Sequence, residues 1–264
     1  MTDALFVRDG ASFVPTELTR GGWTDDSQHG SPPAGLLGRV VEMIPTAVPM
    51  QIVRFTVDLF RAVPLAPLQV TTAVRRDGRR IQVVDAYLRA GDVELGRASA
   101  LKIRTTAVVL PTVQDSEWVR PPLPEDIEVL EWDSYGDRSM PRFHYDAVEI
   151  RSVDASFVST RPGLSWFRLL VPLVAGEEPT PFVRLATLSD LANGNAQALD
   201  PWRYLYINPD ISLYCHRLPV GDWVGMHSWA VQQPTGIGMT DTWVFDQEGA
   251  VGRINQAQLI ELHA

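Results

Sequence analysis

The sequence has few of the features that form disulfides, insert into a membrane or bind a metal ion. Cys215 is the single cysteine among 264 residues, so no intramolecular disulfide can form, which fits a reducing compartment. An apolar run of about 18 residues, as a transmembrane helix needs, is lacking, and so are the basic and apolar regions of a signal peptide. The five histidines are scattered without metal-ligand spacing. We therefore expect a cytoplasmic protein with no membrane insertion and no metal.

Basic residues are scarce relative to acidic ones. The chain has 23 Lys and Arg against 32 Asp and Glu, a formal net charge of −9 and a pI of about 5.0. This excess of negative charge disfavours broad binding to nucleic acid and docking on anionic membranes. The hydrophobic content of 45% is typical of a globular chain with a sizeable core. We expect neither nucleic acid nor a membrane surface among the partners.

The apolar pattern predicts a helix in the first half that begins near Ser31. Serine is a good capping residue, and Pro32 suits the first position of a helix. An apolar stripe continues the helix to about Pro45. Its small residues Gly35 and Gly38 lower the helix propensity but let another element pack very close.

Strand patterns surround this helix and then recur. We expect short strands in residues 5–19 and four hairpin-connected strands in residues 51–104. A proline-rich, acidic segment follows, which is typical of a linker. The second series comprises strands near 143–153 and 164–174, an apolar helix at 184–194, and strand-like runs at roughly 203–217, 222–233, 236–246 and 250–262.

The two halves also match at the level of single residues. Gly96 and Gly252 lie in similar segments at an offset of 252 − 96 = 156, and Pro64 matches Pro219 at 219 − 64 = 155. Internal periodicity governs a fold assignment more than local propensity does. We therefore predict an α+β protein of two repeats, each a helix packed on an antiparallel sheet.

Asp190 lies beside the apolar face of the helix predicted at 184–194. An unpaired carboxylate is costly there unless it is hydrogen-bonded or takes part in chemistry. In the first half, the partners of Asp190, Asn208 and Gln256 at the repeat offset are Gly35, Val53 and Ala100. One half thus carries three polar side chains where the other has none. A satisfied buried network could look the same, but polar groups on three separate elements favour one active site.

Five motifs carry a resemblance to a known family. They are His29-Gly30 at the start of the first helix, Arg54 to Arg61 on the next strand, Ser189-Asp190-Leu191, Asp222-Trp223, and Gly252 to Gln256. With these motifs the chain resembles the double-hotdog acyl-CoA thioesterases of the thioesterase II (TesB-like) family. The resemblance implies an α+β double-hotdog fold of two fused repeats, at 1–110 and 142–264, joined by a linker at 111–141.

The resemblance also implies a reaction. Family members hydrolyse acyl-CoA to free acid and CoA without a metal or redox cofactor, using an Asp, a Thr and a Gln to hold the attacking water. The matching positions are Asp190, Asn208 and Gln256, so the substrate would be a fatty acyl-CoA and Asp190 would assist the water. Asn208 departs from the family's Thr; it can still donate and accept hydrogen bonds, but with a different reach.

The start of the first helix is the predicted substrate-binding segment. Backbone N–H groups around Gly30 and Ser31, aided by the helix dipole, would hold the oxyanion of the attacked thioester. His29 would contact the substrate, although a loop histidine is as often a turn or packing residue. We also expect a homo-oligomer, because sheet edges invite pairing.

Two alternatives stay open at this stage. A non-catalytic acyl-CoA-binding protein is favoured by the departure at Asn208. A hydratase or dehydratase on the same fold would carry an Asp-x-Asn-Pro-x-His signature, whereas here Asn208-Pro209 is followed by Asp210 and Ile211.

Overall fold

The computed structural model describes residues 4–21, 24–110, 121–130, 139–153, 162–196, 199–200 and 203–262. The linker predicted at 111–141 therefore lies largely outside the described residues. Within the described ranges, no helix is both long enough and apolar enough to cross a membrane.

The first half follows the predicted order of elements. They are β1 (Phe6–Asp9), β2 (Ser12–Pro15), a short 3-10 helix (Glu17–Thr19), α1 (Ser31–Glu42), β3 (Met50–Leu59), β4 (Leu68–Asp77), β5 (Ile81–Ala90) and β6 (Val93–Arg104). Helix α1 ends three residues before the predicted Pro45. Its N-cap is Gly30, so the prediction that Ser31 caps the helix was wrong: Ser31 occupies the first helical position.

The second half departs from the prediction at three points: the strand expected from residue 143 starts later, the helix expected at 184–194 is divided into two, and the run expected at 203–217 forms two strands. Its elements are a 3-10 turn (Pro124–Asp126), a π-helical turn (Phe143–Ala147), β7 (Val148–Ser152), β8 (Gly163–Leu169), α2 (Pro181–Leu188), α3 (Leu191–Asn195), β9 (Tyr204–Ile207), β10 (Asp210–Cys215), β11 (Trp223–Gln232), β12 (Ile237–Asp246) and β13 (Gly249–Leu262). The strand expected from residue 143 begins at Val148. Asp146 accepts a hydrogen bond from the backbone N–H of Arg142, and this local bond turns the chain before the strand starts.

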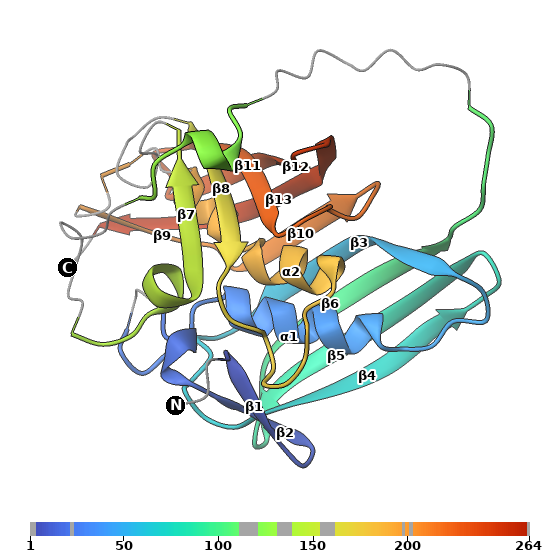
Figure 1. Cartoon of the computed structure of the whole chain (residues 1–264). Helices are drawn as coiled ribbons and strands as arrows, with labels where there is room; N and C mark the ends of the chain where they lie inside the picture. The colour runs from blue at the N-terminus through green and yellow to red at the C-terminus, as the bar shows by residue number, and fades with distance from the viewer. Residues whose placement is uncertain are drawn as a thin grey trace.

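All of these strands belong to one antiparallel sheet. Its order is β1-β2-β4-β5-β6-β3-β10-β13-β12-β11-β8-β7, and β9 pairs with β13. Outward from the central β3–β10 pair, β3-β6-β5-β4-β2-β1 on one side mirrors β10-β13-β12-β11-β8-β7 on the other. The sheet curves around α1 and α2, which lie side by side (Figure 1).

The two helices approach so closely that glycine is required on α1. A Cβ on Gly35 would lie 2.2 Å from Oγ1 of Thr187, and a Cβ on Gly38 would lie 2.8 Å from Cβ of Ala186. Both distances are too short for any side chain, so the close packing predicted from these two small residues is confirmed. This contact brings the far end of α2 to the start of α1.

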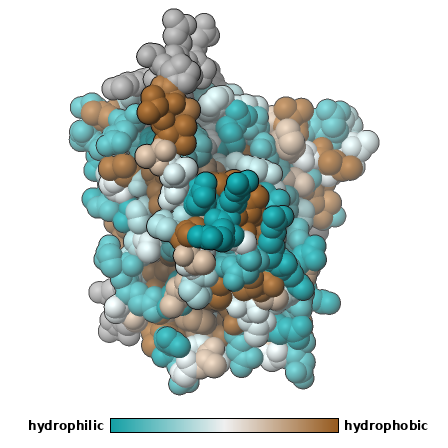
Figure 2. Space-filling view, turned by 90° about the vertical axis from the view of Figure 1, so that its right-hand side faces the viewer, coloured by the Kyte–Doolittle hydropathy of each residue, from teal (hydrophilic) through white to brown (hydrophobic). Residues whose placement is uncertain are grey.

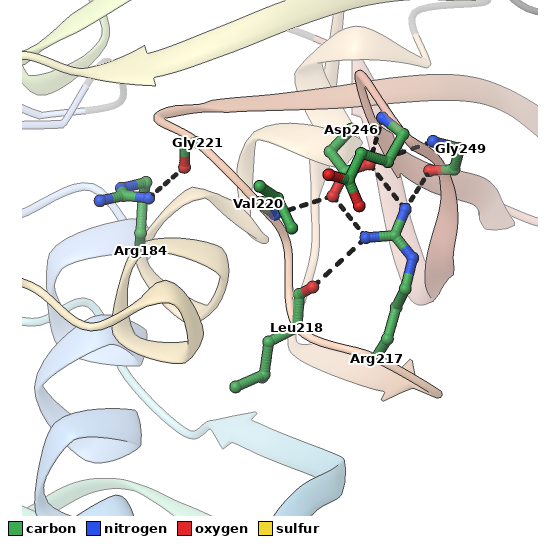
Figure 3. A network of polar contacts seen from close by, with 8 residues as sticks. Arg184, Arg217, Leu218, Val220, Gly221, Asp246 and Gly249 are labelled. Atoms are coloured by element: carbon green, nitrogen blue, oxygen red, sulfur yellow. Dashed lines mark hydrogen bonds and ion pairs between the residues drawn. The ribbon is translucent and has the colours of Figure 1, made fainter.

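A buried carboxylate holds the segment after β10 in place (Figure 3). Arg217 binds both oxygens of Asp246, at 2.5 and 2.6 Å, and the backbone N–H groups of Val220, Glu248 and Gly249 donate to the same carboxylate. Burial alone would raise the pKa of Asp246, but the hydrogen bonds from Arg217 and the backbone outweigh it and lower the pKa below its ordinary value. Asp246 is therefore a structural anchor between the β12–β13 hairpin and this segment.

The anchored segment in turn supports α2. Arg184 of α2 donates to the carbonyl oxygen of Gly221 (Figure 3) and lies 3.2 Å from the carboxylate of Asp222. These contacts fix the helix whose far end enters the candidate site.

We predict that Asp246→Ala lowers the free energy of unfolding by about 3 kcal/mol, because it leaves a partly buried guanidinium and three N–H groups without their acceptor. Ionised Asp246 contributes its full stabilisation of the folded protein above the ordinary Asp pKa. This stabilisation is lost as the pH falls through the lowered pKa that Asp246 has in the folded protein. The difference between wild type and variant should thus be full at pH 7 and shrink below about pH 4. Denaturant unfolding at several pH values measures it.

Asp58→Ala is the matched control, because Asp58 pairs with Arg97 on the surface, with side chains 45% and 57% exposed. Asp58→Ala should lower the free energy of unfolding by no more than about 1 kcal/mol. Equal costs for the two variants would show that the Asp246 network is not an anchor.

Candidate active site

Asp190 lies at a break between two helices, not in the middle of one as predicted. Helix α2 ends at Leu188 and α3 begins at Leu191, while the backbone of Asp190 stays helical with φ −69° and ψ −23°. The Ser189 hydroxyl donates to the carbonyl of Ala186 at 2.7 Å, and this bond competes with the helical ladder. The side chain of Asp190 is 6% exposed.

Three segments of the chain meet at this carboxylate. Asn208, in the connection between β9 and β10, donates from Nδ2 to Oδ1 of Asp190 at 2.6 Å. His29, just before α1, places Nδ1 at 3.0 Å from Oδ2. A Cβ on Gly30 would lie 2.6 Å from the same Oδ2, so the carboxylate fills the space that any other residue would need. Four of the predicted site residues thus converge on one point.

His29 has two competing partners for one ring nitrogen. The backbone N–H of Ser31 donates to Nδ1 at 3.1 Å, and the Asp190 carboxylate faces the same atom. Nδ1 can accept from Ser31 only when it is unprotonated, and it can donate to Asp190 only when it carries a proton. The ring also packs 5.1 Å from that of Phe143 and 6.0 Å from that of His144, centroid to centroid. His29 therefore has a proton-dependent choice of partner beside Asp190.

The start of α1 offers few free N–H groups. Pro32 and Pro33 have none, and that of Ser31 goes to His29. Within the described part of the chain, the N–H of Gly30 forms no hydrogen bond, and Oγ of Ser31 is buried without a partner. The dipole of α1 places partial positive charge at this end. The N–H of Gly30 is thus the donor left for a ligand.

Gln256 lies on the predicted strand, and among the described residues its side chain forms no hydrogen bond with Asp190. It is 1% exposed on β13, and its Oε1 accepts from Thr240 Oγ1 at 3.3 Å. Its Nε2 is buried with no hydrogen-bond partner among the described residues. The predicted residue is therefore buried with an unused donor, and the Asp190 network reaches β13 elsewhere.

That point is Gln258, which the sequence analysis missed. Gln258 lies two residues further on β13 and on the same face, about 7 Å along the strand from Gln256. Its Nε2 donates to Oδ1 of Asn193 at 2.7 Å, and Nδ2 of Asn193 donates to Oδ1 of Asn208 at 3.1 Å. The sequence contained signals for this contact: Gln258 follows Gln256 at the strand period of two, and Asn193 lies three residues after Asp190.

The structure also contains a cavity that is not part of this site. Its volume is about 400 Å³, and it lies at the C-terminal end of α1, roughly 18 Å along the helix axis from Gly30. Lys102 at its wall donates to the carbonyls of Glu42 and Ile44, and burial lowers the pKa of Lys102. Figure 2 shows the side of the molecule that lies at the right in Figure 1, where α1 ends, and polar and apolar side chains are mixed over this face.

Two other kinds of site receive no support. The thiol of Cys215 is buried and donates to the carbonyl of Ile52, and burial raises its pKa to about 12, so it is a poor nucleophile. In the described ranges, no three or more His, Cys, Asp or Glu gather in a group that could hold a metal ion.

The fold has close counterparts among solved structures. An acyl-CoA thioesterase II, TesB2, from Mycobacterium marinum superposes with a TM-score of 0.67 at 17% identity, covering 94% of this chain and 97% of that one. A TesB protein of Mycobacterium avium subspecies paratuberculosis gives 0.66 at 15% identity over 97% and 95%. A protein of unknown function with a hot dog fold from Alicyclobacillus acidocaldarius gives 0.73 at 16% identity over 99% and 97%. No curated protein sequence matches the chain significantly.

The chain thus has the hotdog fold, with a buried carboxylate at the start of a helix. The model of the acyl-CoA thioesterase N-terminal domain matches residues 19–109, and that of the C-terminal domain matches residues 114–260. The chain belongs to this acyl-CoA thioesterase family and is similar to its thioesterase II (TesB-like) members. It is a thioester hydrolase.

We predict that Gly30→Ala lowers kcat per folded molecule at least tenfold, because the new Cβ displaces the Asp190 carboxylate. Gly38→Ala is the comparison: its Cβ meets Ala186 between the helices, away from the carboxylate. It should lower Tm while kcat per folded molecule is kept. Free-thiol release and thermal unfolding measure the two effects, and an unchanged kcat in Gly30→Ala would rule out this placement of Asp190.

Proposed function

We propose that the chain hydrolyses fatty acyl-CoA to free acid and CoA, with Asp190 activating the attacking water. The observation that carries the proposal is the buried carboxylate held between Asn208, His29 and Gly30. A desolvated carboxylate beside a helix N-terminus joins a base to a place where an oxyanion is stabilised.

The reaction needs few groups. Asp190 takes a proton from water while the water oxygen bonds to the thioester carbon, and the carbonyl oxygen becomes an oxyanion. The N–H of Gly30 and the dipole of α1 are suited to stabilise that oxyanion. The C–S bond then breaks, the acid leaves, and the CoA thiolate takes up the proton held by Asp190. Because a thiolate leaves readily, no strong general acid is required.

Gln256 and Ser31 supply the remaining polar atoms of the proposal. Nε2 of Gln256 and Oγ of Ser31 are both buried without a partner in the described chain. A buried polar atom left unpaired costs about 1–3 kcal/mol, so a bound water or substrate oxygen at these atoms would recover that energy. We propose that Gln256 binds the attacking water and that Ser31, with His29, contacts the substrate.

The departure from the family's Thr does not remove the bond that the mechanism needs. Asn208 donates to Asp190 as a threonine hydroxyl could, and it keeps an oxygen free to accept from Asn193. Asn208 therefore acts, in this proposal, as the group that orients the base.

We further propose that the chain is a double hotdog, with repeats at 1–110 and 142–264 and a linker at 111–141. The mirrored strand order supports this organisation. So does the central pair: Thr56 of β3 lies opposite Ser212 of β10, and 212 − 56 = 156 is the offset of the sequence repeat. The homo-oligomer and the cytoplasmic location stay predictions from the sequence.

We predict that the wild type releases CoA thiol from at least some members of an acyl-CoA chain-length panel and that Asp190→Asn lowers kcat at least a hundredfold, because the amide cannot take the proton. Asp85→Asn is the matched control, since that carboxylate lies on β5 and pairs with Arg75 of β4. It should keep wild-type kcat.

Acyl-CoA binding to Asp190→Asn, measured by calorimetry, should persist. Full activity in this variant would contradict the assignment of Asp190. Tight binding by the wild type without any thiol release would favour the non-catalytic acyl-CoA-binding alternative.

We also predict that Asn208→Asp moves the acidic limb of the kcat/KM profile to higher pH. The variant places a second carboxylate within hydrogen-bond distance of Asp190, and two like charges so close favour protonation of one of them. The shift should exceed about one pH unit. An unmoved acidic limb would show that Asp190 does not set it.

A further inference from the structure

A chain of side-chain amides leads through the protein to Asp190. Nε2 of Gln232 donates to Oε1 of Gln258 at 3.1 Å, and Nε2 of Gln258 donates to Oδ1 of Asn193 at 2.7 Å. Nδ2 of Asn193 donates to Oδ1 of Asn208 at 3.1 Å, and Nδ2 of Asn208 donates to Asp190 at 2.6 Å. Every amide thus points its N–H group towards the carboxylate.

We call the amides of Gln232, Gln258, Asn193 and Asn208 the relay. One backbone carbonyl fixes the direction of its hydrogen bonds. Nδ2 of Asn193 also donates to the carbonyl oxygen of Tyr206 at 3.0 Å, and a carbonyl can only accept. The amide nitrogen of Asn193 must therefore face Tyr206 and Asn208, and its oxygen must face Gln258. Asn208 then has to accept from Asn193, which leaves its own N–H for Asp190. Gln258 is 3% exposed and Asn193 is 6% exposed, so little water is available to hydrogen-bond either amide in the opposite orientation.

We propose that Asn193 and Gln258 are positioning residues that hold the Asn208 amide with its N–H towards Asp190 and so keep that carboxylate ionised. Without them Asn208 can rotate and present its oxygen instead, an arrangement that favours the protonated acid. A protonated Asp190 cannot take a proton from water. The inference rests on the proposed role of Asp190 as the base.

Other titratable groups near the carboxylate are few. Nδ1 of His29 lies 3.0 Å from the Asp190 carboxylate, and the ring of His144 lies 6.0 Å from the His29 ring, centroid to centroid. Asp210, two residues after Asn208, accepts from the backbone N–H of Ala257. The relay contains no titratable side chain, so its removal changes no formal charge.

The first test measures the protonation of Asp190 itself. In the full-length protein, the pH midpoint of its carboxyl carbon is followed by ¹³C NMR, beside the acidic limb of kcat/KM. Asn193→Ala should raise both midpoints by about one pH unit. Gln258→Met, which removes the donor that holds Asn193 but keeps the side-chain length, should move them the same way by less, and it keeps the test valid should Asn193→Ala not fold.

Asn195 is the matched control, two residues further on α3. Its buried amide donates to the carbonyls of Gly163 and Met226 and to Ser228, away from the relay. Asn195→Ala should lower Tm and leave both midpoints unmoved. Unmoved or lowered midpoints in the folded relay variants, or an equal rise in Asn195→Ala, would overturn the proposal.

A double-mutant cycle tests whether Asn193 acts through Asn208. A threonine hydroxyl can turn its proton to Asp190 without guidance, so in the Asn208→Thr background the change Asn193→Ala should no longer move the NMR midpoint. An undiminished shift would contradict the relay.

The two proposals fail separately. If Asp190→Asn keeps full activity while the relay variants still raise the NMR midpoint, the catalytic role of Asp190 is contradicted and the role of the relay is supported. Should Asp190→Asn be inactive while the NMR midpoint stays fixed in the relay variants, the catalytic role stands and the relay falls.

Discussion

The burial of one carboxylate is the constraint on which the rest of the structure depends. Asp190 is 6% exposed, and an ionised carboxylate so placed is stable only with hydrogen-bonding partners. Asn208 supplies one from the connection between β9 and β10, and Nδ1 of His29 lies 3.0 Å from the other carboxylate oxygen. To reach them, the junction of α2 and α3 must touch the start of α1, where Gly30 leaves the space of a missing side chain. The same closeness along the helices requires Gly35 opposite Thr187.

The two halves of the chain contribute different chemistry to the meeting point. The first half supplies a helix start, the ring of His29 and the N–H of Gly30, which has no hydrogen bond within the described ranges. The second half supplies the carboxylate and the amides that orient it, anchored through β13 and the segment between β9 and β10. The first helix, with glycine at position 35, serves as the surface against which the second is placed. The carboxylate and the amides of the candidate site therefore come from the second half alone.

The sequence predicted most of the fold, because hairpin turns, strand alternation and amphipathic helices are encoded by near neighbours. It failed where one side chain bonds to nearby backbone: Ser189 interrupts the helix at Asp190, and Asp146 delays a strand. In the candidate site, Asp190 and Asn208 were predicted from the repeat and the family resemblance, and the structure places them in hydrogen-bond contact. Gln258 was missed because the register of β13 decides which glutamine contacts Asn193, and this register depends on strands far away in the sequence.

The central claim, that Asp190 activates water, is tested most directly by one turnover in H₂¹⁸O. Enzyme in excess over acyl-CoA is quenched after a single turnover, and the acid and the peptide containing Asp190 are analysed by mass spectrometry. We predict one ¹⁸O in the released acid and none in Asp190, because water bonds to the thioester carbon. Unlabelled acid with ¹⁸O in the Asp190 carboxylate would contradict this, since it would require a covalent acyl-aspartyl intermediate.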